Sequence, residues 1–229
     1  MSKLVGIIGA MDIEVSGIIS EMTNICEKTY SGIKYVSGKL YGKDAVVAKC
    51  GVGKVFAAIC AQTMVLEYRP DIIVNTGIAG TLTPELGVKD NAIADRVVQH
   101  DMDTSAIGDP IGLISGINKI YIDCDRCVTD LLEKASNLSG IHTLCGTVAS
   151  GDKFIADFCE KNRIASLFGA VCCEMEGASI GQVCYVNNVP FGIIRTISDG
   201  DGEKVDYATF AKEAAQNSVK TIKKFFEIL

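Results

Sequence analysis

Carboxylates and glycines gather at the ends of several strand-like segments of this 229-residue chain. Glu14 follows the first apolar run, Glu176 follows a later one, and Asp199 closes the last. Ligands bind outside the carboxyl ends of strands in open α/β sheets, so we expect these ends to meet at one pocket. Such a pocket suits general acid–base chemistry on an uncharged substrate. Read singly, each acid is more typical of a helix cap or a solvated side chain.

Nucleotide and metal motifs are absent from the sequence. Gly51-Val-Gly-Lys54 is followed by Val55, so it lacks the spacing of a phosphate-binding P-loop. No Gly-x-Gly-x-x-Gly follows the first strand-like run, and no Gly-x-Ser-x-Gly nucleophile elbow occurs. The chain has two histidines, His100 and His142, and no His-Glu-x-x-His, so a zinc hydrolase is not expected. A single Cys124-x-x-Cys127 pair is a weak basis for a metal or redox site.

Composition favours a single α/β domain over residues 1–229. Apolar residues make up 48% of the chain, enough for a sizeable core. The net charge of −6, without a block of Lys and Arg, argues against a nucleic-acid partner. The ten cysteines lie partly within apolar runs, and no signal peptide is recognised, which predicts a reducing cytoplasm. No apolar run reaches membrane-spanning length, so no membrane partner is expected.

Strand-like and helix-like segments alternate along the chain, which predicts a layered α/β domain with a parallel or mixed sheet. Strands are expected at 4–8, 33–40, 45–48, 71–75, 92–99, 142–149, 170–173 and 191–197. Helices are expected at 14–22, 55–68, 128–136, 176–185 and 207–228. Residues 101–117 are rich in Gly, Pro, Asp and Ser and predict a long loop, a feature that is often functional.

Six strings resemble, in the same order, the motifs of the 5′-methylthioadenosine/S-adenosylhomocysteine nucleosidases. They are Gly6–Val15, Gly51–Val55, Asn75–Gly80, Ser150–Ile155, Glu174–Glu176 and Arg195–Asp199. The resemblance covers essentially the whole chain. It implies a three-layer α/β/α sandwich with a central mixed sheet, of the nucleoside phosphorylase-like kind, and a homodimer. It also implies release of adenine and a thioribose product, in methionine salvage and methyl-cycle detoxification, with no cofactor and no metal.

The resemblance assigns the two catalytic roles to Glu14 and Asp199. Asp199 is expected to protonate N7 of adenine, so that the base leaves as a neutral molecule. For this it must hold a proton near neutral pH, in a desolvated site. Glu14 is expected to take a proton from the attacking water. The bond breaks through an oxocarbenium-like sugar, as in other glycosyl transfers.

Further residues are expected to bind the adenine nucleoside. Glu176 would bind the ribose hydroxyls and favour the cationic sugar, Arg195 would position water and acids, and Ser198 would orient Asp199. The remaining contacts fall to Phe154, stacked on adenine; Ile155, reading the edge of the base through its backbone; Ala79 and Gly80, lining base and sugar; Met175, against ribose; and Tyr207, over the base or the thioalkyl end.

Ile78 departs from the family pattern. Many members carry a serine here, whose hydroxyl can contact the catalytic water, and an isoleucine side chain has no hydrogen-bonding group. Two interpretations stay open. Either Glu14, Glu176 and Arg195 hold the water alone, or the pocket differs in substrate preference.

Three other functions compete with this one. A purine nucleoside phosphorylase of the same fold would need several cations for phosphate, whereas Arg195 is the one arginine within these motifs. A hydrolase acting on 6-amino-6-deoxyfutalosine would use the same motifs. A non-catalytic nucleoside-binding protein would need neither Glu14 nor Asp199.

Overall fold

The computed structural model describes residues 3–199 and 207–229, with the helical backbone alone for 207–209. The strands are β1 (Val5–Gly9), β2 (Met22–Tyr30), β3 (Ile33–Leu40), β4 (Lys43–Lys49), β5 (Ile72–Thr81), β6 (Asn91–Gln99), β7 (Tyr121–Asp123), β8 (Thr143–Ser150), β9 (Ala170–Glu174) and β10 (Phe191–Asp199). The helices are α1 (Asp12–Ser20), α2 (Lys54–Tyr68), α3 (Arg126–Leu138), α4 (Phe158–Phe168), α5 (Gly177–Asn187) and α6 (Tyr207–Ile228), with a 3-10 turn at Ser105–Ile107.

One mixed sheet carries these strands in the order β10-β6-β8-β9-β5-β1-β4-β3-β2, and β7 pairs with β6. Strand β10 also pairs with β5, which closes part of the sheet into a ring. Strands β1, β5 and β10 run parallel. Their carboxyl ends therefore lie at the same edge, where the sequence predicts the pocket.

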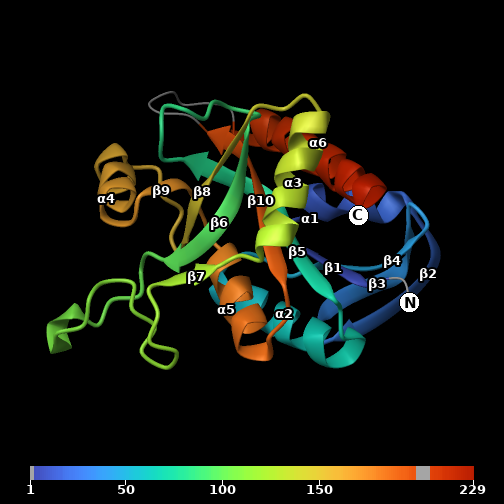
Figure 1. The fold of residues 1–229 in the computed structure, drawn as a ribbon, viewed down its shortest axis with the longest axis horizontal. Coiled ribbons are helices and arrows are strands. Elements are labelled where there is room, and N and C mark those ends of the chain that lie inside the picture. Colours follow the sequence, from blue (N-terminus) through green and yellow to red (C-terminus); the bar gives the residue numbers. More distant parts are fainter. Residues whose placement is uncertain (1–2, 200–206) are drawn as a thin grey trace.

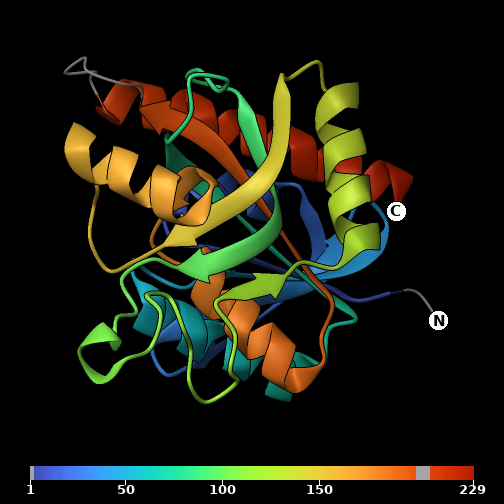
Figure 2. The same cartoon turned by 60° about the vertical axis from the view of Figure 1, so that its left-hand side comes forward.

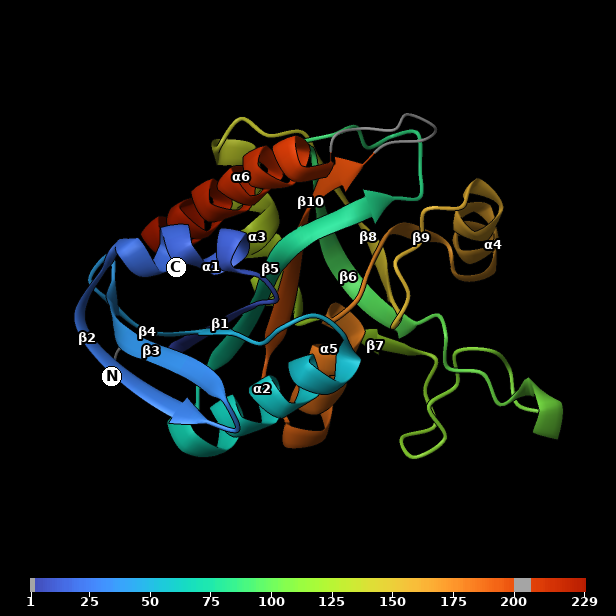
Figure 3. The same ribbon diagram turned by 180° about the vertical axis from the view of Figure 1, so that it is seen from behind.

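Helices cover both faces of the sheet and make three layers (Figures 1 and 3). Helices α1, α3 and α6 lie on one face, and α2 and α5 lie together on the other. Helix α4 stands beside β8 and β9 at one end (Figure 2). This arrangement confirms the predicted three-layer α/β/α sandwich with a central mixed sheet.

Each face of the sheet buries its own apolar cluster. Phe225 and Phe226 of α6 pack with Leu132 of α3 against one face. Met64 of α2 and Ile180 of α5 pack against the other. Both faces of the central strands are therefore apolar, which explains the continuous hydrophobic runs in the sequence.

Three elements, β2, β7 and α4, went unpredicted, and for β2 and α4 the reason is a weak hydrophobic pattern. Seven consecutive residues of β2, 23–29, are exposed, since β2 is an edge strand. Helix α4 buries Lys161, Ile164 and Phe168, so a lysine occupies a position where an apolar residue would reveal the helix. Its caps were readable: the Asp157 side chain accepts from the backbone N–H of Glu160, and Gly169 is left-handed at the end.

The register between β5 and β10 places the site residues. Arg195 lies opposite Gly77, and Asp199 lies opposite Gly80 across a shift in register after Ile197. The predicted strand at 71–75 thus continues to Thr81, because the Gly77–Gly80 segment pairs with β10 and β9.

Candidate active site

A pocket lies at the carboxyl ends of β1, β5, β9 and β10. It brings together eleven of the predicted residues: Glu14, Ile78, Ala79, Gly80, Phe154, Ile155, Met175, Glu176, Arg195, Ser198 and Asp199. Six further residues line it: Ala10, Met11, Val52, Lys153, Cys173 and Glu174. Tyr207 begins α6, and its side chain lies outside the described residues. Residues far apart in sequence thus share one pocket.

Glu14 is held at the start of α1 by three backbone donors. Its Oε2 accepts the N–H of Ala10 at 2.7 Å and of Met11 at 2.9 Å. Its Oε1 accepts the N–H of Ile78 from β5 at 3.1 Å. The side chain is a helix cap and a pocket carboxylate together. Burial raises the pKa of Glu14, and the charge of Arg195 and the backbone donors oppose that rise.

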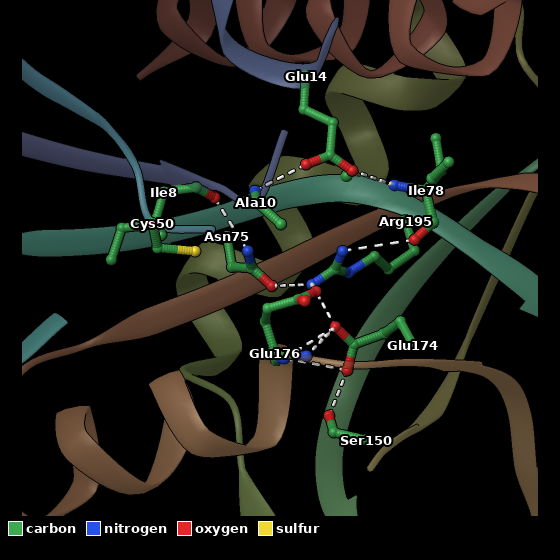
Figure 4. Close-up of polar contacts among 12 residues, drawn as sticks. Ile8, Ala10, Glu14, Cys50, Asn75, Ile78, Ser150, Glu174, Glu176 and Arg195 are labelled. Atoms are coloured by element: carbon green, nitrogen blue, oxygen red, sulfur yellow. Dashed lines mark hydrogen bonds and ion pairs between the residues drawn. The ribbon is translucent and has the colours of Figure 1, made fainter. Parts of the chain in front are cut away.

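Arg195 lies buried at the centre of the site (Figure 4). Its Nη2 donates to Oδ1 of Asn75 at 2.5 Å and forms an ion pair with Glu174. The carboxylate of Glu176 lies 3.6 Å from the same nitrogen. Burial disfavours the charge, yet the surrounding carboxylates leave the pKa of Arg195 above its usual value. The guanidinium is therefore a fixed positive charge.

Glu174 is a site residue that sequence reasoning missed. Its carboxylate accepts the backbone N–H groups of Glu176 and Gly177 at 2.8–2.9 Å and the hydroxyl of Ser150. The acceptor sites of Glu174 are thus occupied by Arg195, by Ser150 and by the first turn of α5. The readable signal was the Glu-Met-Glu string itself, because alternate residues at a strand end point to the same side.

Glu176 faces the pocket with one oxygen held by backbone. Its Oε1 accepts the N–H of Gly53 at 2.8 Å. Burial raises the pKa of Glu176 to about 7, with Arg195 lowering it and Glu174 raising it. Glu176 can therefore change its charge near neutral pH.

Two glycines of β5 leave room for these side chains. A Cβ on Gly77 would lie 2.4 Å from Nη1 of Arg195 and 2.6 Å from Oε1 of Glu14. A Cβ on Gly80 would lie 2.9 Å from Oδ1 of Asp199. The glycines of the Asn75–Gly80 string thus permit close approach of charged groups to the backbone.

Asp199 is paired with a lysine that the sequence did not single out. Nζ of Lys161, from α4, lies 3.0 Å from Oδ2 of Asp199. Beside it, the Ser198 hydroxyl donates to the carbonyl of Ala79 at 3.4 Å, rather than to Asp199. The role of Asp199 as the acid for the base stays a prediction.

The Ile78 side chain packs against Met11, Ala211 and Ala214. Its contribution to the polar site is made by its backbone, which donates to Glu14 and accepts from Arg195 at 3.4 Å. Phe154 lines the pocket and is 59% exposed.

Within residues 3–199 and 207–229, no cluster of His, Cys, Asp and Glu has the arrangement of a metal site. Over the same residues, no helix is long and apolar enough to span a membrane. The arrangement instead offers a buried carboxylate near a fixed cation, and a second acid beside an ammonium. Such groups can accept a proton on one side of a bond and donate a proton on the other side, while positive charge develops as the bond breaks.

The chain matches the family model of the phosphorylase superfamily over residues 4–228. It is 37% identical over 217 residues to the 5′-methylthioadenosine/S-adenosylhomocysteine nucleosidase of Shewanella sediminis, covering 93% of this chain and 94% of that one. The same-named enzyme of Neisseria meningitidis, solved with methylthio-immucillin-A, superposes with a TM-score of 0.94 at 31% identity, covering 99% of this chain and 100% of that one. The futalosine hydrolase of Helicobacter pylori superposes equally, with a TM-score of 0.94 at 31% identity, covering 100% and 99%.

Fold and pocket thus place the chain in the phosphorylase superfamily. Within that superfamily, it belongs to the family of 5′-methylthioadenosine/S-adenosylhomocysteine nucleosidases.

Proposed function

We propose that the protein hydrolyses the N-glycosidic bond of 5′-methylthioadenosine and S-adenosylhomocysteine, releasing adenine and the thioribose product. One observation carries the proposal: a buried Glu14, held by three backbone N–H groups, lines the same pocket as Asp199. A protein that merely bound nucleosides would need neither carboxylate.

Glu14 is the base for water. Its raised pKa makes it a better proton acceptor than an exposed carboxylate, and its backbone donors fix its direction. As water attacks C1′ of the sugar, one water proton passes to Glu14 and the oxygen bonds to C1′. The Ile78 amide holds the base, so the pocket needs no hydroxyl at this position for that purpose.

Asp199 is the acid for the leaving group. The electron pair of the bond between C1′ and N9 moves into the base, and the Asp199 proton passes to N7. Adenine then leaves neutral, which lowers the barrier because the adenine anion is a poor leaving group. Ser198 lies next in the chain and fixes the backbone through Ala79.

Glu176 binds and stabilises the sugar. Its ionised carboxylate binds the ribose hydroxyls and offsets the positive charge that develops on the ring. Arg195 fixes Glu176 and orders water beside Glu14. Because Glu174 and Asn75 occupy the guanidinium, Arg195 is a poor receptor for phosphate, which favours hydrolysis over phosphorolysis.

The remaining pocket residues hold the nucleoside. Phe154 stacks on adenine and the Ile155 backbone reads its edge. Ala79 and Gly80 line base and sugar, Met175 packs against ribose, and Tyr207 covers the base or the thioalkyl end.

The test is adenine release from methylthioadenosine by the purified protein, in buffer without phosphate and with phosphate added. If the protein is a hydrolase, the rate of adenine release should be the same in both buffers, and the second product should be free methylthioribose. A rate that depends on phosphate, with methylthioribose 1-phosphate formed, would transfer the assignment to a phosphorylase.

A second candidate is hydrolysis of 6-amino-6-deoxyfutalosine, and the superposition on a futalosine hydrolase favours it. Both substrates present an adenine base and a ribose, so the same acid and base serve either. Ranking kcat/KM for methylthioadenosine, S-adenosylhomocysteine and 6-amino-6-deoxyfutalosine decides between a dedicated and a shared enzyme.

We also propose that the protein is a homodimer that buries the face formed by α2 and α5. This face is strongly apolar: at the start of α2, Val55 is 69% exposed and Phe56 53%, and Tyr185 and Val186 near the end of α5 are exposed as well. The loop between β6 and β7 projects next to this face (Figure 3), with Ile107 exposed on it. Exposed apolar residues gathered on one face in this way are typical of protein interfaces.

Light scattering tests the dimer. The wild type is expected at twice the mass of the chain, and Phe56→Glu is expected to yield monomer because it buries a charge in the interface. Leu138→Glu, on an exposed position of α3 away from this face, is the matched control and should stay dimeric. A monomeric wild type would end this proposal.

We further place the protein in a reducing cytoplasm, where methionine salvage and methyl-cycle detoxification take place. All ten cysteines are free, and those such as Cys60 and Cys172 are buried as small apolar side chains. Locating the tagged protein in the cell by fractionation tests this placement.

A further inference from the structure

Lys161 is the one lysine whose ammonium lies against the proposed acid, among the described residues of the pocket and α4. It is 4% exposed and sits on the inner side of α4, where Ile164 and Phe168 are its buried neighbours on the helix. Its Nζ lies 3.0 Å from Oδ2 of Asp199. Lysine is rarely buried, because removing the ammonium from water is unfavourable unless a partner compensates.

Packing alone does not account for a lysine here. Replacing a buried ion pair with apolar residues of similar volume is often neutral or stabilising, so an apolar residue would fasten α4 to the sheet as well. Of the pocket carboxylates, Glu174 and Glu176 lie against Arg195, and Glu14 is held by three backbone N–H groups. The Lys161 ammonium lies instead against Asp199. The presence of a buried lysine at position 161 is therefore explained by its effect on Asp199.

The chemistry of the leaving-group step supplies that reason. When the Asp199 proton passes to N7 of the base, negative charge develops on the carboxylate. The Lys161 ammonium is already 3.0 Å away and stabilises that charge without reorganisation. The proton lost by Asp199 is the one gained by the base, so Lys161 needs to give up no proton of its own.

We infer that Lys161 is a positioning residue for Asp199: it fixes the carboxyl at the base end of the pocket and stabilises the carboxylate left after proton transfer. The inference rests on the proposed nucleosidase function. It assigns to α4, which contributes no residue to the six motif strings, a part in the departure of the leaving group.

The test compares two leaving groups. Lys161→Met keeps the length and apolar stem of the side chain and removes the ammonium. Methylthioadenosine needs protonation of its base, whereas 4-nitrophenyl 5-methylthio-β-D-riboside loses 4-nitrophenolate without help from an acid. For Lys161→Met, kcat on methylthioadenosine should fall by about 10-fold to 100-fold, the cost of a misplaced catalytic group. On the nitrophenyl riboside kcat should stay within about 2-fold of wild type, since that step bypasses Asp199.

Two further variants complete the design. Asp199→Asn with Lys161→Met should be no slower on methylthioadenosine than Asp199→Asn alone, because Lys161 acts through Asp199. Lys89→Met is the matched control: Lys89 pairs with Glu213 at 2.6 Å on the surface, and its loss should leave both rates unchanged.

Three results would overturn the inference. The first is hydrolysis of methylthioadenosine by Lys161→Met at the wild-type rate. The second is an equal loss of kcat on both substrates, as expected of a purely structural lysine. The third is a double variant whose loss of kcat is the product of the losses of the two single variants. If wild type itself released no adenine, the proposed function would fail, which is distinguishable because that result involves no variant.

Discussion

The backbone N–H of Ile78 donates a hydrogen bond to Oε1 of Glu14 at 3.1 Å, joining β5 to the start of α1. The Ile78 side chain meanwhile packs against Met11 and α6. The departure from serine at this position therefore leaves the anchoring of the base intact. The replacement of serine by Ile78 instead makes the pocket wall apolar at this position.

Glu14→Gln is expected to lower kcat by about 10²-fold to 10⁴-fold, because an amide cannot accept the proton from water. It should also lower stability by about 1–3 kcal/mol. The carboxylate accepts N–H groups on both oxygens, and the amide nitrogen of glutamine would face one of these donors without an acceptor. Adenine release and thermal unfolding measure the two effects.

Asp12→Asn is the control for that variant. Asp12 lies two residues earlier in α1 and pairs with Lys49 on the surface. Surface pairs contribute about 0–1 kcal/mol, so its rate and stability should stay close to wild type. Unchanged hydrolysis by Glu14→Gln would place water activation elsewhere.

Asp199→Asn should lower kcat on methylthioadenosine by about 10²-fold to 10⁴-fold while substrate still binds. An asparagine can donate a hydrogen bond to N7 but cannot transfer a proton. Binding measured by calorimetry and turnover measured by adenine release separate the two. Asp157→Asn, which keeps a good cap at the start of α4, should behave as wild type. Normal turnover of Asp199→Asn would contradict the acid role.

Gly77→Ala should impair the site although alanine adds a single carbon. That carbon would lie 2.4 Å from Nη1 of Arg195 and 2.6 Å from Oε1 of Glu14, both buried and hydrogen-bonded. Overpacking of this kind destabilises proteins by about 1–3 kcal/mol and should here displace the base. Gly116→Ala, which meets no atom within 4 Å, should be silent in the same activity and unfolding assays. Full activity of Gly77→Ala would show that neither side chain needs its present position.

The pH dependence of activity and of stability should have opposite signs between pH 4.5 and 7. Burial raises the pKa of Glu176 from 4.5 to about 7, so its ionised form, which favours the cationic sugar, is gained as pH rises. We expect kcat/KM to increase over this range. A carboxyl whose pKa is raised by folding binds its proton more tightly in the native state, so its stabilising contribution is lost as pH rises through that value.

Thermal unfolding from pH 4.5 to 7 tests the second half of that prediction. Wild type should lose stability relative to Glu176→Gln as pH increases, because glutamine has no proton to lose. Glu14, whose pKa is also raised, is present in both proteins and acts in the same direction in each. Parallel curves for the two proteins would contradict a titrating Glu176.

Local sequence predicted most elements of the fold, and the exceptions have physical causes. Strand β2 is exposed on both sides because it is an edge strand, and α4 carries Lys161 where an apolar residue is expected. Both hide the periodicity on which prediction depends. Helix α1 begins at Asp12, two residues before the predicted start, since Met11 caps it and Glu14 closes the cap.

Sequence alone determined which residue types the pocket would contain, because the motif strings end strands whose carboxyl ends must share one edge of a parallel arrangement. The tertiary structure decided how those residues are paired. Glu174 binds Arg195, the backbone of Ile78 binds Glu14, and Lys161 reaches Asp199 from a helix 38 positions earlier in the chain. Such pairings depend on register and on helix placement, which bring distant residues to within 3.1 Å of each other and which no local pattern encodes.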